Sequence, residues 1–290
     1  MILKKEIETN AESNGVAKST IDKDWVLGHF IDAIFSVSEW RNQLIFKGGT
    51  CLRKCYFSTY PFSEDLDFTS INKEFELTKI NLSEIIQIIT ERTGILLYIS
   101  ELKPLKHKDQ LTGYKAMIKF WGADHPKNQT PPPPERWTSS VKIEIILYEQ
   151  MIFPVEQREV NNPYSDSLSE IPLIIPCYAI HEVLSEKLRA LIQRSYTAPR
   201  DFYDIWYLSK KSENIDWVKV KEAFLQKMKF KNLEFTGIGQ MINESNDKTL
   251  KSAWKTSLGH QISEEQLPSY ETVKMDLLEL FNKIGLSPEG

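Results

Sequence analysis

The sequence is poor in cysteine and contains no long apolar run. Three cysteines among 290 residues, an odd number, cannot form a closed disulfide framework. Cys51 and Cys55 are spaced as neighbours on one helix and Cys177 is remote, so we expect reduced structural thiols without a redox role. No apolar stretch is long enough to span a bilayer, and the first residues lack the apolar segment of a signal peptide. We therefore expect a soluble, cytoplasmic protein with no membrane partner.

Basic residues are not in excess over acidic ones. The chain has 36 Lys and Arg against 40 Asp and Glu, a net charge of −4, so no general positive field draws it onto nucleic acid. A polyanionic partner would need a local patch. The segment 210–231 carries seven lysines against three acids and is a candidate surface for an RNA backbone. Charged runs on helices also serve commonly as solvated surfaces only.

The hydrophobic pattern changes character after about residue 160. Before it, helical periodicity at 19–39 and 83–93 is mixed with strand-like runs at 44–46, 62–68, 95–102, 114–121 and 141–148. Beyond Pro176, helices are expected near 178–194, 200–210 and 216–229. We therefore predict an α+β fold, with a mixed sheet flanked by helices over 1–165 and an all-helical domain over 166–290. The polar residues 1–17 are expected to be frayed.

The segment FSEDLDF at 62–68 alternates acidic and apolar residues, as a half-buried strand does. Residues two apart on a strand point to the same side, so the carboxylates of Asp65 and Asp67 converge while Leu66 and Phe68 face the core. Converging carboxylates repel each other unless a cation neutralises them, and hard oxygen ligands favour Mg²⁺ or Mn²⁺. The same spacing also fits an acidic edge strand that only faces solvent.

A glycine pair precedes this acidic strand. Gly48 and Gly49 lie where the apolar run 44–46 gives way to a helix that begins at Thr50. Glycines let a backbone approach a phosphate closely, and the amides at the start of a helix form an anion site. Lys47, Thr50 and Arg53 can add donors. Most Gly-Gly turns are only turns, but next to an acidic strand this one predicts a triphosphate site beside a metal ion.

A third carboxylate is expected on a neighbouring strand. In VKIEIILYE at 141–149, Lys142 and Glu144 share one face and apolar residues occupy the other. An isolated carboxylate in the middle of an apolar strand is costly to bury, and a metal ion relieves that cost. Glu144 is therefore the predicted third metal ligand, with a solvent-facing edge-strand glutamate as the alternative.

Five segments in this order resemble the AbiEii/AbiGii toxin family, a branch of the DNA polymerase beta-like nucleotidyltransferase superfamily. The segments are FKGGTCLRK at 46–54, SEDLDF at 63–68, KIEI at 142–145, EVLSEKLRALIQR at 182–194 and RDFYDIW at 200–206. The resemblance covers roughly residues 20–210. It implies a polymerase beta-like fold and a toxin of the abortive-infection, type IV toxin–antitoxin kind, which acts in phage defence.

The implied activity is Mg²⁺-dependent transfer of a nucleotide from an NTP, with release of pyrophosphate. The implied acceptor is RNA, namely a tRNA 3′ end, whose modification blocks translation, and the implied partner is an antitoxin encoded nearby. By position, the resemblance assigns metal binding and catalysis to Asp65, Asp67 and Glu144, further catalytic roles to Lys187 and Asp204, and phosphate binding to Gly48, Gly49 and Thr50. Lys47, Arg53 and Ser63 are further candidate phosphate-binding residues.

The helix that carries Lys187 has an apolar stripe, and Lys187 lies at its border. An ammonium group there can stabilise a triphosphate, or it can simply extend to solvent with its stem on the core. Glu182, Glu186 and Arg189 are expected on the outer face. In the next helix, Asp201 near the start favours the helix dipole, and Asp204 is the better functional candidate.

The chain departs from the family pattern at two positions. Pro61 stands where the family usually carries an Arg, two residues before Ser63, and Glu144 fills a position often held by Asp. Two alternative functions remain open at this stage. One is a catalytically degenerate module of the same fold that binds an NTP or RNA without turnover, and the other is a metal-dependent nuclease.

Overall fold

The computed structural model describes residues 2–126, 128–194 and 198–286. The chain forms two compact units, one of Met1–Glu149 with Val155–Cys177 and one of Gln150–Pro154 with Tyr178–Gly290. The first unit extends to Cys177, because β7 (Ile174–Cys177) pairs in parallel with β1 (Leu44–Lys47). Among the described residues, no helix combines the length and apolarity needed to cross a membrane.

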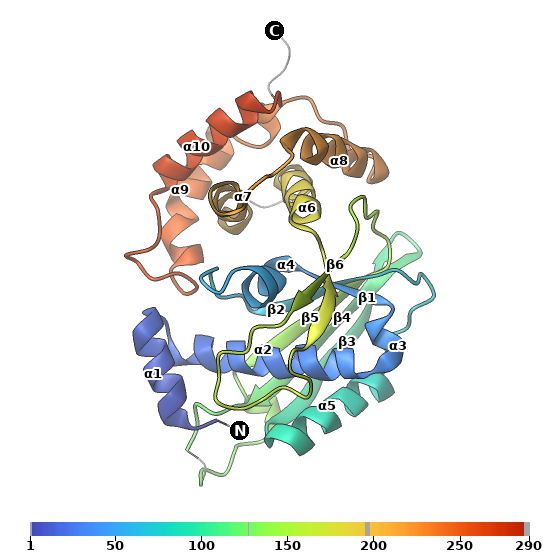
Figure 1. The fold of residues 1–290 in the computed structure, drawn as a ribbon, viewed down its shortest axis with the longest axis vertical. Helices are drawn as coiled ribbons and strands as arrows, with labels where there is room; N and C mark the ends of the chain where they lie inside the picture. Colours follow the sequence, from blue (N-terminus) through green and yellow to red (C-terminus); the bar gives the residue numbers. More distant parts are fainter. Residues whose placement is uncertain (1, 127, 195–197, 287–290) are drawn as a thin grey trace. The chain divides into compact units, whose positions relative to one another are not determined.

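The first unit is built on a seven-stranded mixed sheet in the order β3-β4-β5-β2-β1-β7-β6 (Figure 1). Strand β2 lies in the middle, antiparallel to β1 and parallel to β5. Besides β1 and β7, the strands of the sheet are β2 (Asp65–Ser70), β3 (Leu96–His107), β4 (Gln110–Trp121), β5 (Ser140–Ile146) and β6 (Glu156–Glu159). This confirms the predicted mixed sheet.

Helices α2 (Lys18–Ser36) and α5 (Lys79–Thr93) pack on one face of this sheet. Leu66 and Phe68 of β2 enter the core on that face, where the Phe68 ring lies 6.0 Å from that of Phe35 on α2. Asp65 and Asp67 therefore point to the opposite face, as the alternation predicts. Shorter helical segments are α3 (Ser38–Arg41), α4 (Gly48–Cys51), the π-helical turn η1 (Leu52–Tyr56) and the 3₁₀ turn η2 (Pro134–Arg136).

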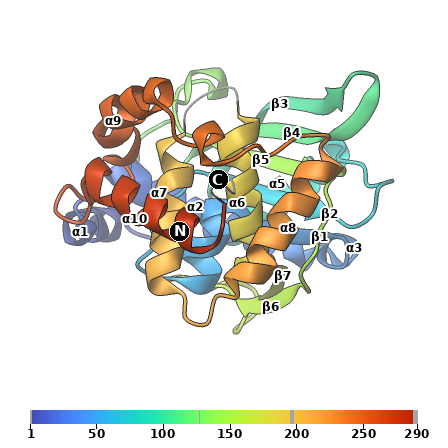
Figure 2. The same ribbon diagram turned by 90° about the horizontal axis from the view of Figure 1, so that it is seen from above.

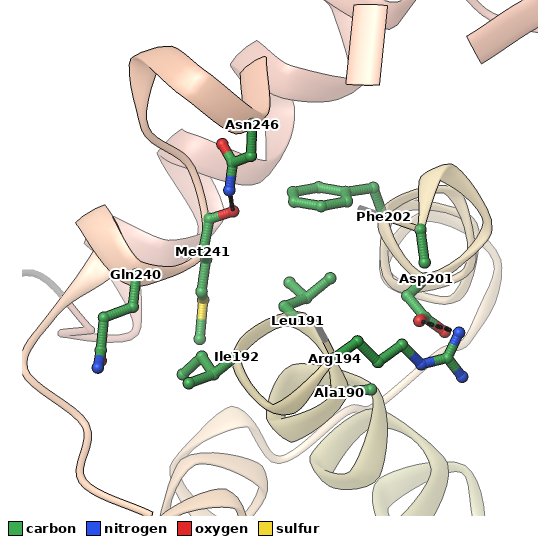
Figure 3. A pocket seen from close by; sticks show the side chains of 10 residues that line it. Ala190, Leu191, Ile192, Arg194, Asp201, Phe202, Gln240, Met241 and Asn246 are labelled. Carbon is green, nitrogen blue, oxygen red and sulfur yellow. Dashed lines mark hydrogen bonds and ion pairs between the residues drawn. The ribbon is translucent and has the colours of Figure 1, made fainter. Parts of the chain in front are cut away.

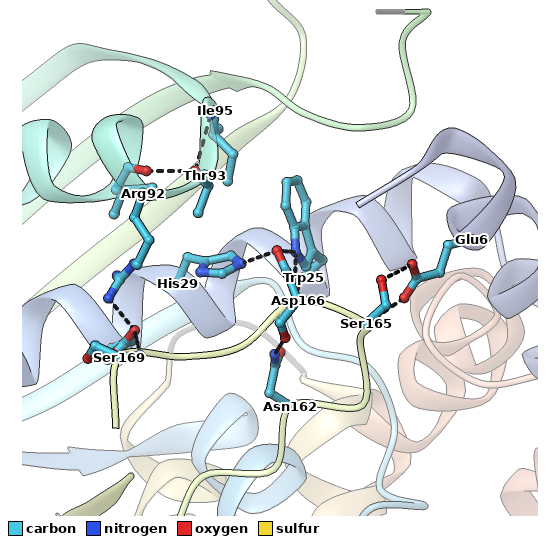
Figure 4. Close-up of polar contacts among 12 residues, drawn as sticks. Glu6, Trp25, His29, Arg92, Thr93, Ile95, Asn162, Ser165, Asp166 and Ser169 are labelled. Atoms are coloured by element: carbon cyan, nitrogen blue, oxygen red, sulfur yellow. Dashed lines mark hydrogen bonds and ion pairs between the residues drawn. The ribbon is translucent and has the colours of Figure 1, made fainter. Parts of the chain in front are cut away.

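The segment 1–17, expected to be frayed, contains the helix α1 (Lys4–Asn14), whereas residue 1 lies outside the described part. Ile7 and Ala11, one turn apart, are buried, and α1 packs against α2. Glu6 accepts hydrogen bonds from the backbone and hydroxyl of Ser165, in the loop before β7 (Figure 4). The expectation was wrong because two anchoring residues in a polar segment give too weak a periodic signal.

The second unit is helical, as predicted. Helix α6 packs against both α7 and α8 and lies between them (Figures 1 and 2). The elements are α6 (Ile180–Gln193), α7 (Pro199–Lys211), α8 (Trp217–Phe230), the 3₁₀ turn η3 (Ile238–Gln240), α9 (Glu244–Leu258) and α10 (Tyr270–Lys283).

Charged residues that were expected at the surface lie in the interior of this unit, among them Glu182, Arg189 and Lys227. Lys227 is fully buried, where it pairs with Glu182 and donates a hydrogen bond to the carbonyl of Gln150 at 2.6 Å. Glu182, expected on the outer face of α6, also accepts bonds from the amides of Ile152 and Phe153 at 2.9 and 2.8 Å. Helical periodicity identifies a polar side but does not distinguish solvent from a packed polar segment. Lys227 therefore does not belong to the RNA-binding surface predicted over 210–231.

Candidate active site

Strands β2 and β5 bring the three predicted acids to one face of the sheet. Their parallel pairing sets Asp65 beside Lys142 and Asp67 beside Glu144. The side chains of Asp65 and Glu144 are 41% and 32% exposed, whereas Leu66 between the two aspartates is fully buried. The three acids therefore lie on one face of the sheet, as the alternation within each strand predicts, because β2 and β5 are direct neighbours.

A lysine occupies the space between two of these acids. The Lys142 Nζ lies 2.8 Å from Asp65 Oδ2 and 3.9 Å from Glu144 Oε2. In the part of the chain that the structure describes, three cysteines form the one group of ligating side chains gathered closely enough to hold an ion. Metal binding by the three acids stays a prediction, and it requires the Lys142 ammonium to withdraw.

Asp67 is the acid whose charge is least favourable. Burial raises its pKa from 3.8 to about 6, and the negative charges of Asp65 and Glu144 add to this, although Lys142 and Lys47 act in the opposite direction. A carboxylate that is partly desolvated beside two like charges is stabilised by a cation. The donor set therefore fits a hard divalent ion, since all three side chains offer oxygen.

Gly48 lies directly against Asp67. Its φ of +80° is in the left-handed region, and a Cβ at this position would lie 2.4 Å from Asp67 Oδ2. Two requirements therefore favour glycine at this position: its left-handed backbone conformation and the space that the Asp67 carboxylate occupies. The next turn is also tied to the acidic strand, because the Thr50 hydroxyl donates a 2.5 Å hydrogen bond to the carbonyl oxygen of Asp65.

The remaining predicted phosphate-binding residues are spread more widely. Lys47 pairs with Asp67 across the sheet and is 8% exposed, and Gly49 follows Gly48 in α4. Ser63 lies in the loop just before β2 and is half-buried. Arg53 points elsewhere: its Nε donates to Asp24 Oδ1 at 3.1 Å. Of the predicted phosphate-binding residues, the structure thus brings Lys47, Gly48 and Thr50, but not the Arg53 side chain, to the acidic strand.

Arg53 lies beside the loop in which the family arginine is replaced by Pro61. Its guanidinium carbon is 3.4 Å from the centre of the Phe62 ring, and its Nη1 donates to the carbonyl of Tyr60. A guanidinium group is therefore present at this loop, although it comes from η1. The sequence gives no signal for this, because the contact joins separate segments.

Lys187 and Asp204 meet in the second unit. The Lys187 Nζ lies 2.7 Å from Asp204 Oδ2 and 2.8 Å from Asp201 Oδ1, and both aspartates are buried. Burial lowers the pKa of Lys187, but the two negative charges more than offset it and raise the pKa above its usual value. Arg200 pairs with Asp204 at 2.7 Å. Arg194 pairs with Asp201 at 3.0 Å, and both line a pocket of about 200 Å³ (Figure 3).

Sequence reasoning missed two residues of these clusters. Lys142 is two positions from Glu144, and that spacing signals a shared strand face. Asp201 is three positions from Asp204 in RDFYDIW, which places both on one side of a helix. In each case the local spacing was visible, but the interaction partner could be identified only from the packing.

Removing the Lys142 ammonium is expected to strengthen Mg²⁺ binding. Replacing Lys142 by Met takes away a positive charge that competes for Asp65 and Glu144, so the Mg²⁺ concentration at half-maximal activity should fall by roughly three- to tenfold. Lys103→Met, at a charged position on the edge strand β3, removes the same charge away from the acids and should not shift it. A half-saturating Mg²⁺ concentration that rises in Lys142→Met would contradict the competition.

Comparisons with known proteins agree on the family and the fold. The sequence model of the family described as "Nucleotidyl transferase AbiEii toxin, Type IV TA system" matches residues 29–275. The fold is similar to that of MenT4, a nucleotidyltransferase toxin from Mycobacterium tuberculosis H37Rv, with a TM-score of 0.59, 17% identity and coverage of 100% of both chains. It is also similar to JHP933 from Helicobacter pylori, with a TM-score of 0.55, 15% identity and 93% coverage of both chains. No curated protein sequence matches the chain.

Proposed function

This chain belongs to the AbiEii family of nucleotidyltransferase toxins of type IV toxin–antitoxin systems, and on that premise we propose that it transfers a nucleotide from an NTP to the 3′ end of a tRNA. The observation that supports a transfer site most directly is the register of β2 and β5, which sets Asp67 beside Glu144, with Gly48 against the Asp67 carboxylate. The tRNA acceptor rests on the family resemblance.

The proposed cofactor is Mg²⁺, with Mn²⁺ as a substitute, held by Asp65, Asp67 and Glu144. When bound, such an ion neutralises triphosphate charge and activates the acceptor hydroxyl. The protein's own part is positioning: Gly48 and Gly49 admit the phosphates close to the backbone, and Lys47 supplies a positive charge beside Asp67. Lys142, which pairs with Asp65 at 2.8 Å, would supply a positive charge for a phosphate oxygen when an ion holds that carboxylate.

The experiment that tests the activity combines tRNA, Mg²⁺ and each α-labelled NTP with the purified protein. Label is expected on RNA of tRNA length with one NTP or a subset, with one pyrophosphate released per nucleotide added. Periodate oxidation of the tRNA destroys its 3′ diol and should prevent labelling. Label that survives oxidation, or that appears on protein, would overturn the 3′-end acceptor, and RNA shortened without an NTP would indicate a nuclease.

The proposed cellular role is a cytoplasmic toxin restrained by an antitoxin encoded next to it. Transfer to a tRNA 3′ end would block aminoacylation and hence translation. Induced expression without the antitoxin should therefore arrest growth, and the Asp67→Asn variant, expressed at the same level, should not. Equal growth arrest by both proteins would separate toxicity from nucleotide transfer.

Lys187 and Asp204 of the second unit are proposed to contribute to catalysis. The same residues form an ion pair with a buried carboxylate, so an experiment must distinguish a catalytic role from a role in stability only. Lys187→Met leaves two buried carboxylates without their shared ammonium and should lower the free energy of unfolding by about 3 kcal/mol or more. Adding Asp201→Asn and Asp204→Asn should recover much of that loss in a thermal melt. If the recovered triple variant still transfers nucleotides at the wild-type rate, the cluster is structural only.

A further inference from the structure

The three cysteines lie together, although Cys177 is far from the other two in sequence. Their Sγ atoms all lie within 4.8 Å of one another. Cys51 ends α4, Cys55 lies in η1, and Cys177 ends β7. Cys177 reaches the other two despite this separation, because β7 lies beside β1 and Cys177 pairs there with Phe46.

The helical segment formed by α4 and η1 holds the sulfurs of Cys51 and Cys55 close to that of Cys177. Cys51 and Cys55 are one helical turn apart, and the turn at Cys55 is π-helical, with the Phe57 amide donating to the Leu52 carbonyl at 2.8 Å. Such turns are rare and occur frequently at functional sites. The Lys54 carbonyl accepts a 2.7 Å hydrogen bond from the Asn161 amide, which fixes the turn from outside.

The cysteine group is buried but can be reached. Cys51 and Cys177 are fully buried, whereas Cys55 is partly exposed and lines an open pocket of about 340 Å³ together with Glu159 and Asn161. A small ion can therefore approach Cys55 from solvent, and the two other sulfurs lie within 4.8 Å of the Cys55 sulfur.

The surroundings favour one thiolate in this group. Hydrogen bonds from Cys177 and Cys51 lower the pKa of Cys55 to about 5, and the positive charges of Lys54 and Arg158 act in the same direction. Burial raises the pKa of Cys51. Lys54 and Arg158 thus place positive charge near the sulfurs, which can balance the negative charge of metal-bound thiolates.

We propose that Cys51, Cys55 and Cys177 bind a thiophilic d¹⁰ metal ion such as Zn²⁺. Metal–sulfur bonds of about 2.3 Å place sulfurs roughly 3.8 Å apart in a tetrahedral site, so small side-chain rotations close this group around an ion. An all-sulfur donor set selects soft ions and disfavours Mg²⁺. Binding releases the remaining thiol protons to solvent, and water from the Cys55 pocket completes the coordination.

This second ion would join β7 to the helical segment that begins at Gly48. It is separate in donor type from the oxygen ligands Asp65, Asp67 and Glu144. Its expected role is to stabilise the first unit, and it goes beyond the proposed nucleotide transfer.

The test is a titration of the reduced, full-length protein with Cd²⁺, a spectroscopic substitute for Zn²⁺. Because the chain has only three cysteines, every thiolate-to-metal charge-transfer band comes from this group. We expect the band to grow to one ion per chain, with the intensity of three Cd–S bonds, and to decrease when Zn²⁺ is added in competition. Zn²⁺ should also raise the melting temperature, whereas Mg²⁺ should leave the band unchanged.

Two variants make the result specific. Cys55→Ser should remove about one third of the band intensity and weaken Zn²⁺ binding on the order of 100-fold. Asp67→Asn should leave the band and its stoichiometry unchanged, which separates this site from the proposed catalytic one. The proposal is overturned if folded wild-type protein with three titratable thiols gives no band at one equivalent, or a band of two thiolates or fewer.

Discussion

Replacing Asp67 by Asn is expected to lower kcat/KM for nucleotide transfer at least about 1,000-fold, while the fold becomes as stable as the wild type or more so. The loss follows from removing one of the three proposed metal ligands, the carboxylate whose strand position pairs with Glu144. The stability follows from the same geometry: burial raises the pKa of Asp67 to about 6, so its charge opposes folding at pH 7. Asparagine keeps the shape without the charge, which relieves up to about 3 kcal/mol.

The pH dependence of stability gives an independent check of this charge. The folded protein binds the Asp67 proton more tightly than the unfolded chain does, because the folded pKa is raised from 3.8 to about 6. In metal-free buffer, the free energy of unfolding contributed by Asp67 should therefore fall as the pH rises from about 4 to about 6. In chemical denaturation, the free energy of unfolding of the wild type relative to that of Asp67→Asn should therefore decrease between about pH 4 and about pH 6.

The matched control for both measurements is Asp109→Asn, an exposed aspartate in the turn between β3 and β4. It removes the same charge from the same unit and should change neither activity nor the pH profile. If Asp67→Asn has a lower free energy of unfolding than the wild type at pH 7, the Asp67 carboxylate stabilises the fold and the prediction is wrong. If it keeps its activity, the acid is not part of the catalytic centre.

The central strands could be predicted because each carries its pattern within one short segment. Alternation over 62–68 places Asp65 and Asp67 opposite the core, and alternation over 141–148 does the same for Glu144. Their register, Asp67 beside Glu144, is a property of strand pairing and does not follow from either pattern alone. The family resemblance predicts the order of the motifs along the chain, whereas only the pairing of β2 with β5 brings Asp67 beside Glu144.

The features that escaped prediction depend on contacts between distant segments. Cys177 reaches Cys51 only because β7 pairs with β1, and Lys227 is buried only because Gln150 and Glu182 pack around it. Hydrophobic periodicity reports which side of an element is apolar. It does not report which polar side chains find partners inside the fold, so buried ion pairs and thiol groups are missed systematically.

Replacing Gly48 by Ala is expected to lower nucleotide transfer at least about 100-fold and to destabilise the fold by about 1–3 kcal/mol. Two effects combine: the new Cβ would lie 2.4 Å from Asp67 Oδ2, and φ is +80°. The Asp67 carboxylate must therefore move away from the new Cβ, and a displacement of about 1 Å in a reacting group is sufficient for such a loss.

Backbone strain alone can be measured at Gly94, which ends α5 with a φ of +75°. Gly94→Ala should cost about 1 kcal/mol of stability and leave nucleotide transfer unchanged. The clash is isolated by a double-mutant cycle, because Gly48→Ala should cost less stability when Asp67 is already Ala. If Gly48→Ala behaves as Gly94→Ala does, with activity within about threefold of wild type, the bend is only a turn. A large activity loss at Gly48, coupled to Asp67, would instead place the glycine pair in the nucleotide site.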